Sequence, residues 1–130
     1  MLKHSCEAER IGAAVVDSAI AVHSALGPGL LEKTYETCLA HELTCRGFHA
    51  SRQVGLPLRY RDLIVEDAYK IDILVNDTIV IEAKAIETLQ PVHRGQLLSY
   101  LRLGEYKLGF LLNFNVARMR DGIVRLANGL

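Results

Sequence analysis

The stretch YKIDILVNDTIVIEAKA, residues 69–85, carries the pattern that decides the fold. It contains two largely apolar runs, separated by Asn76 and Asp77, two residues that tolerate the backbone angles of a hairpin turn. We therefore predict two antiparallel strands, 68–75 and 78–85. The second run is apolar on both faces, which favours a central position in the sheet.

Three charged residues interrupt these strands: Asp72, Glu82 and Lys84. Glu82 and Lys84 are two positions apart, so their side chains lie on the same face of the strand. A two-residue turn places Asp72 opposite Ile81, next to Glu82. A register shift or a bulge of one residue would bring the two carboxylates to a common place.

Carboxylates inside a sheet need a compensating partner, because an isolated buried charge costs several kcal/mol. A divalent cation removes the repulsion between two carboxylates, and ligation by oxygen alone suits magnesium or manganese. A neighbouring lysine can position a water or stabilise a phosphoryl oxygen. The chemistry therefore indicates metal-assisted hydrolysis of a phosphodiester. The alternative is a set of cross-strand ion pairs at exposed strand ends, because this short pattern also recurs by chance.

Hydrophobic periodicity predicts the remaining elements. The order is helix, helix, three strands, helix, strand and one further short strand, which indicates an α/β (α+β) fold with a mixed sheet flanked by helices. Pro57 favours an edge position for the first strand. The expected ranges are helices over 7–26 and 30–46, a strand over 52–60, a turn over 61–66, a helix over 91–103, and strands over 107–115 and 122–128. The periodic positions expected on the first helix are Ile11, Val15, Ser18, Val22 and Leu26. The apolar face expected on the second helix carries Leu31, Tyr35, Cys38, Leu39 and Leu43.

Other motifs stand in order around the charged strands. They are Gly29-x-x-Glu32-x-x-Tyr35, Gln96-x-x-x-Tyr100, and the sequence GFLLNFN at 109–115. Together they resemble the GxxExxY protein family, a branch of the PD-(D/E)XK nuclease-like superfamily. The resemblance implies a restriction-endonuclease-like core, formed as a single domain over residues 1–130 with an additional N-terminal helix. It also implies a Mg²⁺- or Mn²⁺-dependent nuclease with DNA or RNA as its substrate.

The resemblance further implies roles for individual residues. The expected catalytic residues are Asp72, Glu82, Lys84, Glu32 and Gln96, and Tyr100 is a further candidate for lining the same cleft. The expected metal ligands are the carboxylates of Asp72, Glu82 and Glu32 and the main-chain carbonyl of Ala83. Glu32 has an alternative explanation, because acidic residues at the start of a helix oppose the macrodipole. Tyr35 is expected in the core with its hydroxyl bound to a neighbour.

Composition limits the other possibilities. The chain has 130 residues, and its 15 basic residues balance its 15 acidic ones, which argues against binding to nucleic acid or membrane through bulk charge. It leaves room for a local basic groove. The three cysteines contain no CxxC pair, which fits a reducing compartment. With no apolar run long enough for a signal peptide or a membrane span, we expect a cytoplasmic protein.

Several alternatives stay open at this point. The chain could be a non-catalytic module that binds a partner or forms a homodimer, because its N-terminal helix carries more apolar surface than one small core covers. Cys38, His41 and Cys45 share one helix and could contribute to a soft-metal site, although a buried cysteine is commoner. His93 and Arg94 could contact phosphate or could simply form a solvated first turn of their helix.

Overall fold

The computed structural model describes residues 2–130, with side chains from Cys6 onward. The nine elements, in chain order, are α1 (Leu2–Leu26), α2 (Glu32–Cys45), β1 (Ala50–Tyr60), β2 (Leu63–Val75), β3 (Ile79–Lys84), α3 (Pro91–Gly104), β4 (Leu108–Asn113), the 3₁₀ helix η1 (Met119–Gly122) and β5 (Ile123–Ala127). This order confirms the predicted one, with the last short strand included.

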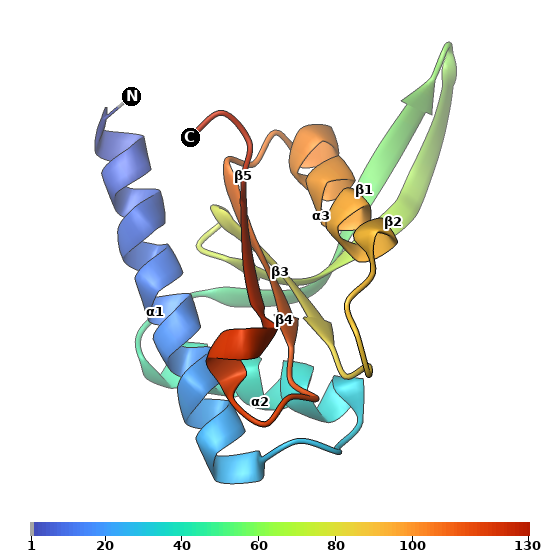
Figure 1. Cartoon of the computed structure of the whole chain (residues 1–130). Helices are drawn as coiled ribbons and strands as arrows, with labels where there is room; N and C mark the ends of the chain where they lie inside the picture. The colour runs from blue at the N-terminus through green and yellow to red at the C-terminus, as the bar shows by residue number, and fades with distance from the viewer. Residues whose placement is uncertain (1) are drawn as a thin grey trace.

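The five strands form one mixed sheet in the order β1-β2-β3-β4-β5 (Figure 1). Strands β3 and β4 run parallel, joined by the crossover through α3, and the other neighbours run antiparallel. As predicted, β3 is central: its residues 79–83 are all buried. Pro57 lies in β1, an edge strand, where its missing N–H breaks no ladder. The restriction-endonuclease-like arrangement expected from the sequence is therefore the one observed.

Two hydrophobic clusters cover the two faces of the sheet. One packs α1 and α2 against residues such as Ile73, Ile79 and Ile81. The other packs α3, through Leu97 and Leu101, against residues of the opposite face. Burying aliphatic side chains of this size stabilises a fold by about 1.5–3 kcal/mol each. The two faces therefore form separate layers, and each side chain of the sheet can be assigned to the α1–α2 face or to the α3 face.

The predicted helix faces need small corrections. On α2, Tyr35, Leu39 and Leu43 are fully buried as expected, but Leu31 precedes the helix and is 77% exposed. On α1, the periodic stripe ends at Val22, and Leu26 is 37% exposed because the chain turns away at Gly27. Within residues 2–130, no helix is both long and apolar enough to cross a membrane.

The β1–β2 hairpin is much longer than predicted and projects past α3 (Figure 1). The predicted turn over 61–66 is wrong, because the turn contains only Arg61 and Asp62 and β2 begins at Leu63. Tyr60 therefore pairs with Leu63, and Leu58 with Val65. A bulge between Leu56 and Leu58 bends this distal part, which we call the arm (residues 58–66).

The β2–β3 register also differs from the predicted one by one residue. Asn76 and Asp77 both have positive φ, 50° and 51°, as a hairpin turn of this kind requires. However, Thr78 also belongs to the loop, so Val75 pairs with Ile79 and Ile73 with Ile81. This is the one-residue shift that brings acidic side chains of the two strands face to face.

Candidate functional site

Two acidic side chains enter the seam between β2 and β3 where the strand ladder stops. The last ladder pair is Ile73 with Ile81, and one step further Asp72 lies opposite Glu82. The Asp72 N–H donates to Glu82 Oε2 at 2.9 Å, and the Ala83 N–H donates to Asp72 Oδ2 at 2.9 Å. Each carboxylate thus accepts an amide of the opposite strand in place of a carbonyl, so the backbone itself holds the two groups together.

The alternation of β2 changes at this point. Ile71 packs in the cluster on the α3 face, whereas Ile73 packs on the α1–α2 face. Residues two apart on a regular strand share a face, so β2 turns over at Asp72 and directs its side chain into the seam. On β3, Val80 packs on the α3 face, which places Glu82 and Lys84 on that face too.

Burial dominates the electrostatics of the pair. It is the main cause that raises the pKa of Asp72 to about 6 and the pKa of Glu82 to about 8. The charge of Asp72 is the second cause for Glu82, and the hydrogen bonds from the backbone oppose both shifts. The ammonium of Lys84 also lowers the pKa of each carboxyl. Negative charge at this place is therefore costly, and Lys84 offsets part of that cost.

A third carboxylate, which the sequence did not indicate as a site residue, belongs to Glu36 of α2. Glu36 is 6% exposed, and its negative charge raises the pKa of both Asp72 and Glu82. Arg52 of β1 binds it through a 2.9 Å salt bridge. The burial of Glu36 could have been predicted from the sequence, because Glu36 falls on the buried stripe of α2 at helical spacing from Leu39 and Leu43.

Glu32, the residue predicted instead, lies one helical turn before Glu36. Its Oε2 accepts the N–H of Ala85 at 3.3 Å, directly after Lys84 at the end of β3. The carboxylate of Glu32 therefore fixes the end of β3. Of the two glutamates, Glu36 is the one whose charge acts on the acidic pair.

Gln53 joins Glu36 to the acidic pair. Its Nε2 donates to both oxygens of Glu36 at 3.0 and 3.1 Å and, more weakly, to Asp72 Oδ1 at 3.4 Å. The backbone of Gln53 has φ 52°, in the left-handed region that non-glycine residues rarely adopt. Strained residues of this kind cluster at functional sites. The left-handed backbone directs the side-chain amide of Gln53 towards the carboxylates. Nothing in the local sequence indicates this backbone conformation.

The α3 side of the site contains Gln96 and Tyr100. Gln96 Nε2 donates to the hydroxyl of Tyr100 at 3.0 Å. Burial raises the pKa of Tyr100, and the negative charges of Glu82 and Asp72 raise it further, so its hydroxyl is within electrostatic reach of the acidic pair. The structure thus brings together Asp72, Glu82, Lys84 and Tyr100, with Gln96 one contact away.

A hard divalent cation fits the chemistry of the pair. Asp72 and Glu82 offer only oxygen donors, and a doubly charged cation would relieve their repulsion. Among the side chains that the structure describes, from Cys6 onward, no group of three or more His, Cys, Asp and Glu is close enough together to hold a metal ion. The three carboxylates predicted as ligands are therefore not gathered at one point, since Glu32 is directed to Ala85. A cation held by the pair would need backbone oxygen, water or substrate as its other ligands.

The other candidates have structural explanations. His93 Nδ1 accepts the N–H of Gln90 at 2.8 Å and so caps the start of α3. Cys45 Sγ lies 3.4 Å from His41 Nε2, one turn apart on α2, while Cys38 packs against the core. Tyr35 is confirmed as a core residue, and its hydroxyl donates to the carbonyl of Gly27 at 2.6 Å.

Comparison with known proteins adds one finding. A family model described as the PD-(D/E)XK nuclease superfamily matches residues 9–126, which includes all of the residues discussed above. No curated protein and no solved structure matches the chain.

Proposed function

Because the chain belongs to the PD-(D/E)XK nuclease superfamily, we propose that it is a metal-dependent nuclease that hydrolyses phosphodiester bonds of DNA or RNA. The observation that carries the proposal is the buried pair of Asp72 and Glu82, held by each other's strands, with Lys84 on the same face. Burial and mutual repulsion make an ionised acidic pair destabilising for the fold, whereas a bound cation would neutralise both charges.

The proposed roles follow from this placement. Asp72, Glu82 and the carbonyl of Ala83 would hold Mg²⁺ or Mn²⁺, which when bound polarises a phosphoryl oxygen and makes a water more acidic. Lys84 can donate a hydrogen bond to the attacking water or to the phosphoryl oxygen. Gln96 orients the hydroxyl of Tyr100 at the edge of the pair. We assign Glu36 as the acidic residue of α2 that tunes this site, and Glu32 as a ligand that acts through water.

We further propose that the chain is of the GxxExxY branch. The structure supplies a physical reason for the spacing of that motif. Gly29 has φ 97°, which favours glycine, and the Tyr35 hydroxyl accepts the N–H of Leu30 at 3.0 Å, so both shape the loop before α2. Glu32 then reaches the end of β3. The same proposal includes one domain over residues 1–130 with α1 as its additional helix, and a location in the cytoplasm.

Lys84→Ala should reduce metal-dependent cleavage by about a hundredfold, because a positioned donor for developing charge is removed. The measurement is a panel of single- and double-stranded DNA, RNA and branched substrates with Mn²⁺. Lys70→Ala is the matched control, since Lys70 is an exposed lysine of the same hairpin. Equal rates for the wild type and Lys84→Ala would show that this lysine has no part in the reaction.

A specific observation favours the alternative, a non-catalytic module that forms homodimers. Four apolar side chains share one face of the arm: Leu58, Tyr60, Leu63 and Val65. Tyr60 and Leu63 are 61% and 57% exposed. Val65 on the same face is 39% exposed. We infer a second copy of the chain as its partner, because two such apolar faces packed against each other would remove both from water.

Leu63→Asp should therefore convert the protein to a monomer, weakening self-association by about tenfold or more. Sedimentation velocity over a range of concentrations measures this. Ile20→Asp on α1 tests the rival idea from the sequence that the N-terminal helix carries the contact. If Leu63→Asp sediments like the wild type and Ile20→Asp does not, the arm is not the dimer interface.

A further inference from the structure

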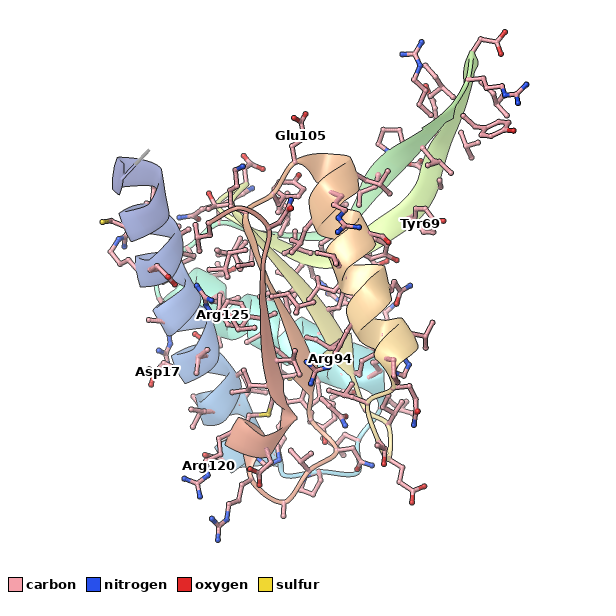
Figure 2. All side chains as sticks on the ribbon, turned by 45° about the horizontal axis from the view of Figure 1, so that its top comes forward. Asp17, Tyr69, Arg94, Glu105, Arg120 and Arg125 are labelled. Atoms are coloured by element: carbon pink, nitrogen blue, oxygen red, sulfur yellow. The ribbon has the colours of Figure 1, made fainter. Side chains whose placement is uncertain are left out.

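A pocket lies between β2 and α3, on the same face of the sheet as Glu82 and Lys84. Its volume is about 480 Å³, within the range of small-ligand sites. Tyr69 supplies the β2 side, and Figure 2 shows it beside α3, where the hairpin leaves the body of the sheet. The α3 residues that line it and matter here are His93, Gly95, Gln96, Ser99 and Tyr100.

The pocket is close to the acidic pair. Tyr69 stands three residues before Asp72 on β2, about 10 Å along a strand. Tyr100 lines the pocket with its ring 5.5 Å from that of Tyr69, and the charge of Glu82 acts on its hydroxyl, so Tyr100 links the pocket to the acidic pair. A nucleic-acid strand that passes the carboxylates could therefore place a neighbouring nucleotide in the pocket.

The lining has the chemistry that a nucleobase needs. Tyr69 is 40% exposed, so part of its ring is available for stacking. His93, Gln96, Ser99 and the Tyr100 hydroxyl provide donors and acceptors for the edge of a base, which is how an unstacked base is recognised. A paired base is already stacked and cannot enter such a pocket.

Gly95 of α3 lines the pocket and leaves space beside the helix. A Cβ at this position would meet no atom within 4 Å, so the space above the helix is empty there. Glycine inside a helix destabilises it by about 1 kcal/mol relative to alanine. A large side chain at this lining position has room to extend over the pocket, so Gly95 is a place where bulk can be added to obstruct it.

We propose that this pocket binds a nucleobase from an unpaired stretch of nucleic acid, next to the phosphodiester at Asp72 and Glu82. The substrate class is then single-stranded nucleic acid, or a duplex with an unpaired segment. The choice of cleaved substrate rests on the proposed function, whereas binding of the base does not require cleavage.

The test uses oligonucleotides that contain 2-aminopurine, whose fluorescence falls when it stacks on an aromatic ring. The protein carries Glu82→Gln and is kept in chelator, so that no cleavage interferes. We expect quenching and binding with a single strand and not with the matching duplex. Adding Tyr69→Ala or Gly95→Leu should weaken binding about tenfold and abolish quenching, while Tyr69→Phe should retain both. Tyr60→Ala, which removes an exposed tyrosine of the arm, is the matched control.

Binding that is unchanged by both Tyr69→Ala and Gly95→Leu would overturn the proposal, as would equal quenching with duplex. Circular dichroism checks that each variant is folded; Gly95→Leu should melt no lower than its parent. The nuclease proposal fails separately, if Glu82→Gln with Mn²⁺ cleaves as fast as the wild type. If the protein quenches 2-aminopurine but never cleaves, the proposed base pocket stands and the proposed nuclease activity is excluded.

Discussion

Glu82→Gln should reduce metal-dependent cleavage by about a thousandfold or more and at the same time raise the thermal stability of the metal-free protein at pH 8. Both effects have one cause. The carboxylate of Glu82 is buried beside Asp72, so its charge is useful only when a cation is present. The amide oxygen of the substituted side chain can still accept the N–H of Asp72, so the seam keeps its hydrogen bond while the repulsion disappears.

Calorimetric titration with Mn²⁺ in the millimolar range and thermal melts give the two readouts. The wild type should take up the cation and melt at a higher temperature with it, whereas Glu82→Gln and Asp72→Asn should show neither effect. Asp62→Asn, in the exposed turn of the arm, is the matched control and should behave as the wild type. If Glu82→Gln destabilises the metal-free protein or retains uptake, the acidic pair serves the fold and not a cation.

The residues that make the site could be predicted from sequence only where local pattern determines structure. The long periodic segments of α2, β3 and α3 were predicted at nearly their observed positions, because helix and strand periodicity reflects the face that each buries. The register of the β2–β3 hairpin was not predicted correctly, because this register depends on whether Thr78 belongs to the turn. That single residue decides whether Asp72 faces Ile81 or Glu82.

The missing parts of the site depend on long-range contacts. Glu36 joins the acidic pair only through residues of other elements, because Arg52 and Gln53 of β1 bind it and Gln53 also contacts Asp72. The positive φ of Gln53 has no local signal, since glutamine is not a residue that favours it. Family motifs led instead to Glu32, one turn away on the same helix.

The arm was missed for a compositional reason. Residues 61–66 contain two acidic residues and one arginine, and this polarity resembles a loop. Yet Leu63, Ile64 and Val65 form an apolar, partly β-branched run, which favours a strand. A two-residue turn at Arg61, where φ is 54°, suffices to reverse the chain. This apolar run is exposed in the structure, and an interpretation that places apolar strands in the core does not anticipate an exposed one.

Stability of the metal-free protein should fall as pH rises from about 4 to about 8, which is the second large effect. The pKa of Glu82 is raised from 4.5 to about 8, and that of Asp72 from 3.8 to about 6. A raised pKa means that the folded state holds the proton more tightly than the unfolded chain. The resulting stability is complete below the unfolded values, near pH 4, and is lost progressively as pH rises through 6 and then through 8.

The loss should reach several kcal/mol, equivalent to a decrease in melting temperature of about 10 °C or more. Melts in chelator at half-unit pH intervals measure it, and the difference between wild type and Glu82→Gln isolates the site from all other titrating groups. With saturating Mn²⁺ the slope should reverse, because the cation binds the ionised carboxylates and competes with protons for them. Parallel curves for the two proteins, with and without Mn²⁺, would mean that Glu82 ionises as readily in the folded protein as in the unfolded chain, and the electrostatic basis of the cation site would be removed.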